Sequence, residues 1–239
     1  MRVALFIPCF VDQFFPDTAM NMVRILEKLG CTVTYNPNQT CCGQPAFNAG
    51  FWDDAHEVAL KFLEDFKNEE YIVAPSASCT GFVRNYYPKL FENRANTSGA
   101  VEVGKKAFEF TEFLTDVLQV HQIGSTWNGK ITYHDSCAAL RECRIKAGPR
   151  ALLQQVAGLE LVEMDATDTC CGFGGTFAVK YGDISAAMAD QKINHALNTG
   201  AQAIVSTDLS CLMQLQGVIR KKGIALETMH IADILASGW

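Results

Sequence analysis

Two adjacent cysteines begin a glycine-rich stretch in the second half of the sequence, Cys170-Cys171-Gly172-Phe173-Gly174-Gly175. Its first three residues form a Cys-Cys-Gly triplet, which also occurs earlier as Cys41-Cys42-Gly43. Each triplet has one cysteine well upstream and another well downstream, at nearly equal spacings. The first set is Cys9, Cys41, Cys42 and Cys79, and the second is Cys137, Cys170, Cys171 and Cys211. The repetition predicts that the chain is an internal duplication.

The segments around the cysteines repeat as well. Apolar runs at 3–7 and 130–134 precede the first cysteine of each set, and short β-type runs at 71–74 and 203–206 precede the last. Patterns with apolar residues three and four apart, at 53–66 and 183–197, indicate helices after the triplets. This alternation predicts an α/β fold of two duplicated Rossmann-like lobes with parallel sheets, and with the cysteines at the C-terminal ends of strands.

Turn-forming residues mark a boundary between the two copies. Segments 96–99 and 125–129 are rich in Asn, Ser, Thr and Gly, and they flank an amphipathic pattern at 105–120 that predicts one helix. We therefore expect an N-terminal lobe over residues 1–125 and a C-terminal lobe over residues 126–239.

Composition excludes several classes of protein. The chain has 239 residues, 49% of them hydrophobic, which is enough to form a buried core. Its net charge is −6 and it has no basic run, so we expect no nucleic-acid partner. No apolar stretch approaches the roughly 18 residues of a membrane span, and none fits a signal peptide. A cytoplasmic location is expected, with any attachment to the inner membrane made through partners.

Ten cysteines in a reducing compartment call for a metal or a redox function. Four thiolates that meet at one sheet edge suit a four-iron, four-sulfur (4Fe-4S) cluster or a structural zinc ion. Zinc sites usually take cysteines two to four residues apart, whereas adjacent cysteines suit a multi-iron body better. The pattern therefore favours iron–sulfur clusters, one or two in number, with zinc as the alternative. A disulfide between adjacent cysteines is disfavoured because its ring is strained.

Several other residues have both a functional and a structural interpretation. The backbone N–H groups near Gly43, Gly172, Gly174 and Gly175 could approach cluster sulfur atoms. Cys31 is expected in the core, and so is Cys143, although its proximity to Cys137 leaves open an approach to the cluster. For His134 and Asp135 we favour a strand-end histidine and a capped turn over a proton relay, and His230 has no visible partner at a helix start.

Motifs for independent catalysis are missing from the sequence. It contains no P-loop, no dinucleotide-binding fingerprint and no G-x-S-x-G element. Metal clusters without an organic-cofactor site are typical of an electron relay within a larger complex, and no catalytic residue is predicted.

The cysteine motifs, with their flanking segments 6–9, 41–45, 133–137, 170–177 and 211–213, resemble the cysteine-rich (CCG) domain family over the whole chain. The match within that family is to the small iron–sulfur subunit of an L-lactate dehydrogenase complex. The resemblance implies an electron-transfer subunit that passes electrons toward the respiratory chain. It also implies two partners, a larger ferredoxin-like iron–sulfur subunit and a third small subunit.

One departure from the family pattern concerns cluster type. The full family motif ends in C-x-x-C, but Ser76 and Asp208 stand at the first position of that element here. Four cysteines per site make an ordinary cluster more probable than a non-cubane one and put disulfide-reducing catalysis in doubt. A thiol/disulfide redox enzyme of the heterodisulfide-reductase type and a zinc-stabilised assembly subunit remain the alternatives. We expect Asp208 to be a helix N-cap rather than an oxygen ligand.

Overall fold

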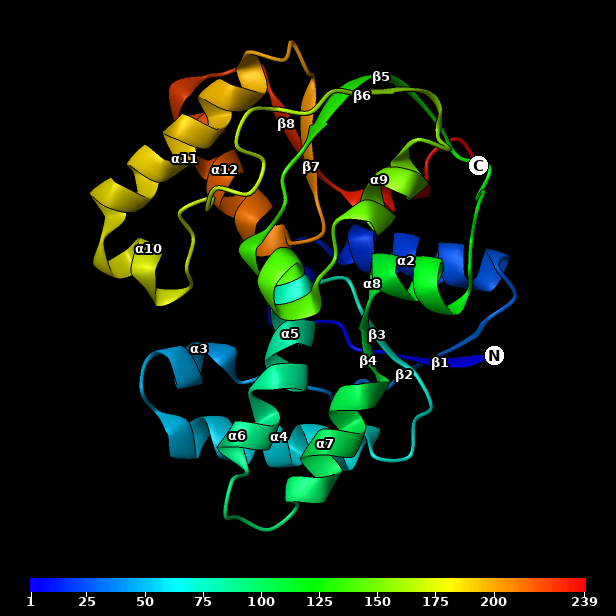
Figure 1. The fold of residues 1–239 in the computed structure, drawn as a ribbon, viewed down its shortest axis with the longest axis vertical. Helices are drawn as coiled ribbons and strands as arrows, with labels where there is room; N and C mark the ends of the chain where they lie inside the picture. Colours follow the sequence, from blue (N-terminus) through cyan, green and yellow to red (C-terminus); the bar gives the residue numbers. More distant parts are fainter.

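The computed structural model describes residues 1–239, which form two α/β halves one above the other (Figure 1). The elements of the first half are β1 (Arg2–Leu5), α1 (Cys9–Phe14), α2 (Pro16–Lys28), β2 (Thr32–Tyr35), α3 (Gln44–Asn48), α4 (Trp52–Phe66), β3 (Ile72–Ala74), α5 (Ala77–Asn85), α6 (Tyr87–Leu90), α7 (Thr97–Lys106), β4 (Ala107–Glu109), α8 (Phe110–Glu112) and a π-helix (Phe113–Val117). Those of the second half are β5 (Thr126–Tyr133), a π-helix (Ala139–Cys143), α9 (Ala147–Leu153), β6 (Ala157–Leu161), α10 (Thr176–Lys180), α11 (Gly182–Leu197), β7 (Ala203–Ser206), α12 (Leu209–Lys222), β8 (Glu227–His230) and α13 (Ile231–Leu235).

Each half contains one four-stranded parallel sheet, and the two sheets have the same strand order. The first runs β2-β1-β3-β4 and the second β6-β5-β7-β8. The central strands pair in equivalent ways, with Ala4 opposite Ile72 in the first sheet and Ile131 opposite Ala203 in the second. The predicted fold class, two duplicated Rossmann-like lobes with parallel sheets, is therefore confirmed.

The alternation of side chains along β1 explains how the halves pack together. Val3 and Leu5 point to one face of the sheet and belong to a core of 36 buried residues that also includes Ile131 and Tyr133 of β5. Ala4 points to the other face, into a separate apolar cluster that contains buried residues of α4 and α7. One face of the first sheet is thus covered by its own helices, and the other shares a core with the second half.

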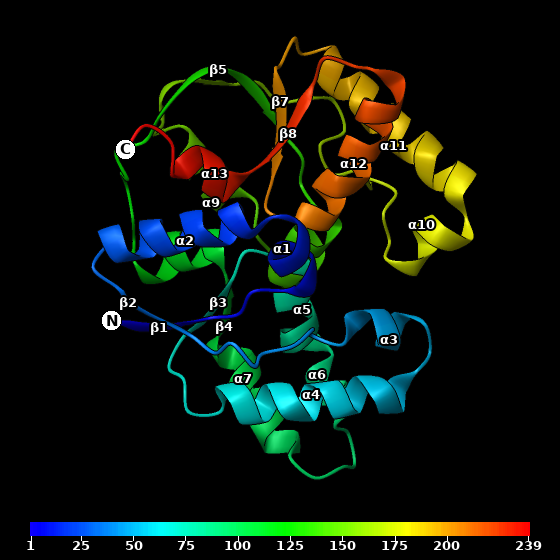
Figure 2. The same ribbon diagram turned by 180° about the vertical axis from the view of Figure 1, so that it is seen from behind.

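Helix α2 lies at this shared core, beside α13 (Figure 2). Its side chains Thr18 and Asn21 donate hydrogen bonds of 3.0 Å to the carboxylate of Asp233 in α13. The N-terminal and C-terminal segments of the chain are therefore in direct contact, and the two sheets do not belong to separately packed units.

The region between the sheets differs from the sequence prediction. The helix expected over 105–120 is wrong, because α7 ends at Lys106 and the next three residues form β4, which pairs with β3. Glu109 ends this strand and caps α8 in a reciprocal capping box with Glu112. The expected boundary at 125/126 falls between the sheets and stays a prediction.

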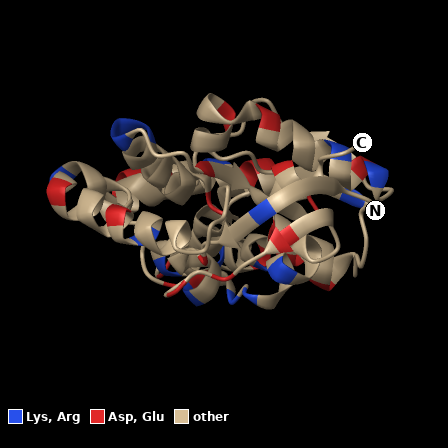
Figure 3. Ribbon diagram, turned by 90° about the horizontal axis from the view of Figure 1, so that it is seen from above, with Lys and Arg blue, Asp and Glu red and all other residues tan.

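No helix of the fold combines the length and the apolar character that a membrane span requires. Basic and acidic residues are interspersed along the elements seen from above (Figure 3).

Candidate metal centres

The fold brings the two cysteine sets to equivalent places. The first cysteine of each set, Cys9 or Cys137, follows the first central strand of its sheet. The last, Cys79 or Cys211, lies in the first turn of the helix that follows the other central strand, α5 or α12. The adjacent cysteines lie in the loops that lead to α3 and α10. All eight line a single cavity of about 560 Å³ between the halves.

We call Cys9, Cys41, Cys42 and Cys79 the N-terminal centre. The Sγ atoms of Cys9 and Cys41 are 3.9 Å apart, and those of Cys42 and Cys79 are 3.5 Å apart. Hydrogen bonds from the thiols of Cys42 and Cys9 lower the pKa of Cys41 to about 3. The same contact with Cys41 raises the pKa of Cys9 and of Cys42. The four sulfur atoms therefore form a connected group in which Cys41 is the thiolate acceptor.

We call Cys137, Cys170, Cys171 and Cys211 the C-terminal centre, and its contacts follow the same order. Cys170 interacts with the thiols of Cys137 and Cys171, which lower its pKa to about 2. Cys171 in turn interacts with Cys211, and its own pKa is raised by its contact with Cys170. Both sets are thus gathered from separated segments into sulfur clusters of equal connectivity.

The glycine of each triplet has a defined structural role. Gly43 and Gly172 adopt left-handed backbone conformations, with φ of 89° and 91°. In this conformation each glycine N–H reaches the Sγ atom of the first cysteine in its triplet, Cys41 or Cys170, at 3.4 Å. A Cβ atom on Gly172 would lie 2.4 Å from the backbone oxygen of Ser185 in α11. The triplet therefore needs glycine both for its conformation and for its contact with the following helix.

The other two predicted glycines, Gly174 and Gly175, line the cavity. Both have positive φ, 52° and 61°. Gly175 faces the opposite half, where the Asn48 side chain is 3.9 Å from the position of a Cβ atom. In Figures 1 and 2, α3 and α10 lie on the same side of the molecule, at opposite edges of this cavity.

Ser76 and Asp208 join the two halves beside the centres. They form an antiparallel β-bridge with each other, and Ser76 donates a 3.2 Å hydrogen bond to Asp208. The Asp208 carboxylate also accepts hydrogen bonds from Ser78, at 2.9 Å, and from Ser136, at 2.8 Å. Asp208 occupies the N-cap position of α12, as expected, but its side chain makes no capping hydrogen bond, because hydroxyl groups of three serines bind its oxygens instead. Burial raises its pKa.

His134 was expected to be structural, but its ring lies among the sulfur atoms of the C-terminal centre. A ring nitrogen and the Sγ atoms of Cys171 and Cys211 all lie within 4.8 Å of one another. The ring is buried and neither nitrogen forms a hydrogen bond, although the Thr167 carbonyl is near enough to oppose the lowering of its pKa. Burial lowers its pKa to about 4, so the imidazole is neutral at pH 7. Sequence spacing alone gave no sign of this contact.

The remaining residues singled out from the sequence have structural partners. Asp135 forms a two-point ion pair with Arg150, at 2.8 Å for each contact. His230 accepts a hydrogen bond from the Ala232 N–H and so caps α13. Cys31 lies in the shared core, and Cys143 donates to the Ala77 carbonyl at 3.3 Å, away from the cavity.

The duplicated arrangement can be compared with known proteins. The pattern of the cysteine-rich domain matches residues 3–84 and 131–216, which make up most of the chain. The chain belongs to the cysteine-rich (CCG) domain family. Each of the two matched ranges contains one complete cysteine set, so the duplication in the sequence corresponds to two CCG domains.

Two relatives match nearly the whole chain. Lactate utilization protein A of Oceanobacillus iheyensis is 42% identical over 236 residues, which are 98% of this chain and 96% of the relative. Lactate utilization protein A of an Exiguobacterium species is 42% identical over 240 residues, covering 99% and 98%. A hypothetical protein from Helicobacter pylori has a similar fold, with a TM-score of 0.65 at 10% identity, over 98% of this chain and 48% of its own.

The side chains of the two CCG centres fit metal binding. Each centre offers four sulfur donors, of which one is already favoured as a thiolate and receives a backbone N–H. Metal binding deprotonates coordinating thiols outright, so all four can serve as ligands. A cavity of about 560 Å³ is larger than one or two single ions need. Donor type and donor number suit a thiolate-bound metal centre in each half.

Proposed function

We propose that this chain is an iron–sulfur electron-transfer subunit of an L-lactate-oxidising complex. One observation carries the proposal: two equivalent sets of four cysteines converge on a single cavity. The names of the relatives, lactate utilization protein A, support the assignment to lactate metabolism. The proposed acceptor of the electrons is the respiratory chain, and the proposed location is the cytoplasm or the inner-membrane surface, reached through partners.

Each centre is expected to hold one cluster, of the ordinary 4Fe-4S type. The proposed ligands are Cys9, Cys41, Cys42 and Cys79 in the N-terminal centre and Cys137, Cys170, Cys171 and Cys211 in the C-terminal centre. When bound, such a cluster stores and passes single electrons. The backbone N–H groups of Gly43 and Gly172 then stabilise thiolate charge, since each already donates to a sulfur atom.

Exposure at the centres supports a relay role. Cys42, Cys171 and Cys211 are buried, whereas Cys9 and Cys137 are exposed. Each centre therefore has a protected side and a side that a partner subunit could approach. We propose the larger ferredoxin-like iron–sulfur subunit and the third small subunit as these partners. In this proposal the partner subunits oxidise the substrate, and this chain only transfers electrons.

Sulfur geometry supports a second candidate, a zinc-stabilised assembly subunit. Four thiolates around one zinc ion at about 2.3 Å lie about 3.8 Å apart. The Sγ separations of 3.5 and 3.9 Å in the N-terminal centre are close to that value. In this case the metal would hold loops together and carry no electrons.

The lowered pKa of two cysteines supports a third candidate, a thiol/disulfide redox enzyme. Cys41 and Cys170 are half-buried and border the cavity, and hydrogen bonds from neighbouring thiols lower the pKa of each. Reactive cysteines have this combination of low pKa and access. Such an enzyme would work without metal and would turn over disulfides as an isolated chain.

Metal analysis separates the three candidates. The protein is purified without oxygen, and its iron, acid-labile sulfide and zinc are measured per chain. The proposal predicts about eight irons and eight sulfides, from two four-iron clusters. Stoichiometric zinc without sulfide would support the second candidate, and a metal-free chain that reduces disulfides would support the third. The isolated chain is also expected to show no lactate oxidation with an artificial electron acceptor, and turnover would contradict the relay role.

A further inference from the structure

The two centres have the same sulfur connectivity, but the side chains next to them differ. Phe6 and His134 are equivalent, because each lies three residues before the first cysteine of its set. Phe62 and Lys192 are also equivalent: each lies seven residues after the residue whose carbonyl faces the triplet glycine, Ala55 or Ser185. An apolar pair in one half thus corresponds to a polar pair in the other.

The N-terminal pair is an ordinary aromatic contact. The rings of Phe6 and Phe62 are 4.8 Å apart and nearly perpendicular, the favourable edge-to-face arrangement. Both rings are buried in the apolar cluster that includes Cys42. The N-terminal centre therefore has no charge and no side-chain hydrogen-bond donor beneath it at these two positions.

The C-terminal pair is His134 and Lys192, and both side chains are buried. His134 lies beside the sulfur atoms of Cys171 and Cys211, and neither of its ring nitrogens has a hydrogen-bond partner. An unpartnered buried N–H is costly, so a sulfur acceptor at this place would remove a real penalty.

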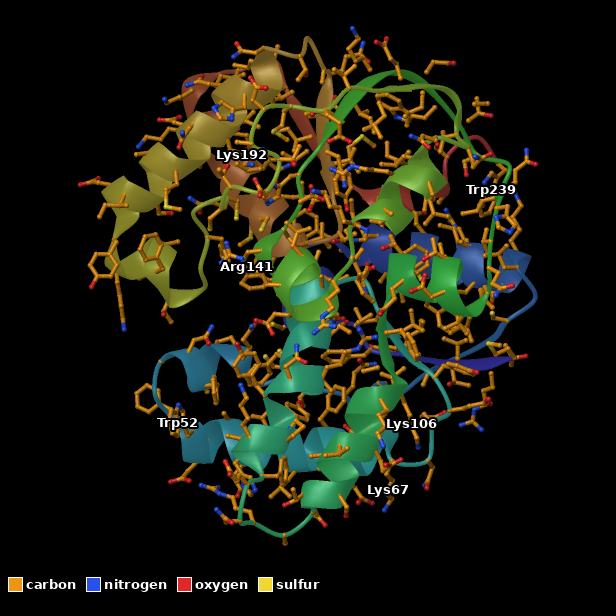
Figure 4. The ribbon with its side chains drawn as sticks, in the orientation of Figure 1. Trp52, Lys67, Lys106, Arg141, Lys192 and Trp239 are labelled. Atoms are coloured by element: carbon orange, nitrogen blue, oxygen red, sulfur yellow. The ribbon has the colours of Figure 1, made fainter.

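Lys192 is a buried amine without an ion-pair partner. It lies on α11 in the upper half of Figure 4 and donates to the backbone carbonyls of Ala166 and Thr167, at 2.6 and 3.1 Å. None of the ion pairs in the structure includes it. Burial lowers the pKa of Lys192, and the negative charges of Asp168, Cys171, Asp135 and Cys211 oppose that shift. Since no carboxylate forms a direct ion pair with this buried amine, an anionic group bound by Cys171 and Cys211 would add counter-charge on the side of the C-terminal centre.

We propose that the two centres differ in reduction potential, with the C-terminal centre higher because His134 and Lys192 stabilise its reduced form. The inference rests on the proposed iron–sulfur function. Reduction adds one negative charge to a cluster, and a nearby cation and N–H donor favour that state. One electron then passes from the N-terminal centre, which starts reduced and becomes oxidised, to the C-terminal centre, which starts oxidised and becomes reduced. The transfer is favourable because the C-terminal centre has the higher potential.

The test is a redox titration of the iron-loaded protein, followed by electron paramagnetic resonance. Each centre is measured alone in a double variant. Cys170→Ser with Cys171→Ser removes the C-terminal centre, and Cys41→Ser with Cys42→Ser removes the N-terminal centre. We expect the C-terminal centre to have the higher midpoint potential. Lys192→Met should lower the equilibrium constant for reduction of this centre about tenfold, which lowers its midpoint potential by about 59 mV for one electron. His134→Phe, which matches Phe6, should have an effect of the same size.

Conservative and remote variants keep the test specific. Lys192→Arg retains the charge and His134→Gln retains an N–H donor, so each should recover most of the lost potential. Lys222→Met removes an equal charge from a half-exposed lysine that pairs with Asp190 on α11, and it should leave both potentials unchanged. The N-terminal centre should not respond to the His134 or Lys192 variants.

The outcomes distinguish this inference from the function on which it rests. Iron is measured in every sample first, and a chain that takes up none overturns both. Iron-loaded centres with equal potentials, or a C-terminal potential that does not respond to Lys192→Met and His134→Phe, would overturn the inference and leave the iron–sulfur function standing. Loss of potential in Lys192→Arg as large as in Lys192→Met would show that packing, not charge, is responsible.

Discussion

Substitution of Gly172 by alanine tests whether the Cys-Cys-Gly turn depends on glycine for the two reasons given by the structure. The first is its left-handed backbone, with φ of 91°, which costs an L-residue about 1–2 kcal/mol. The second is the position of the new Cβ, 2.4 Å from the Ser185 oxygen, which belongs to the backbone of α11 and cannot rotate away. Overpacking of this kind costs about 1–3 kcal/mol. We expect Gly172→Ala to lower the free energy of unfolding by about 2–5 kcal/mol.

Two other glycines separate these contributions. Gly200 has φ of 69° with nothing within 4 Å of its Cβ position, so Gly200→Ala should cost only the backbone term, about 1–2 kcal/mol. Gly217 lies inside α12 with free space around it, so Gly217→Ala should stabilise the chain by about 1 kcal/mol.

The assay is urea unfolding of the metal-free, reduced chain, with iron content of the loaded chain as a second measurement. Gly172→Ala should lose the iron of one centre, and Gly200→Ala should keep all of it. Equal destabilisation by Gly172→Ala and Gly200→Ala would refute the steric argument, since it would leave no cost for the contact with Ser185.

Three further predictions follow from the centres and from buried carboxyl groups. Cys41→Ser and Cys170→Ser should each lose one centre's iron, while Cys31→Ser and Cys143→Ser should lose none; iron loss from Cys31→Ser would show that the ligands are assigned wrongly. Asp208→Asn should cost about 1–3 kcal/mol in urea unfolding, because three hydroxyl donors lose a carboxylate acceptor; Asp54→Asn, at an exposed position on α4, is the control, and equal stability of the two variants would contradict the network. Burial raises the pKa of Glu109 to about 8, above its unfolded value of about 4.3, so the folded chain holds this proton more tightly and stability should fall as pH rises from about 4.5 to 8, by at most about 1.4 kcal/mol per pH unit. Glu109→Gln should flatten this dependence and the exposed Glu102→Gln should not; an unchanged pH profile in Glu109→Gln would show that another group is responsible.

The repeated parts of the chain were predictable from its sequence. Parallel strands buried on both faces leave short apolar runs, and a cysteine follows each central strand in both copies, so sheet and ligand edge could be deduced together. The strand β4 could not, because its three residues continue the apolar spacing of the helix before it and only the pairing with β3 distinguishes them.

Contacts between distant segments could not be predicted from the sequence. Asp208 has the residue type and the position of a helix N-cap. Its hydrogen-bond partners are Ser76, Ser78 and Ser136, which come from other segments. Lys192 lies in a helical pattern where lysine normally indicates a solvent-facing position. It is buried because α11 packs against the loop that carries Cys170 and Cys171, and this contact between segments cannot be deduced from helical spacing. Alignment of the two copies places Lys192 at the position of Phe62, and this equivalence is the one feature of the sequence that indicates a buried position.

The most direct test of the central claim is a crystal structure of the protein purified and crystallised without oxygen, with anomalous data collected on both sides of the iron and zinc absorption edges. The account predicts two separate iron peaks, one bounded by Cys9, Cys41, Cys42 and Cys79 and the other by Cys137, Cys170, Cys171 and Cys211. Zinc at these positions, or iron at neither, would contradict it.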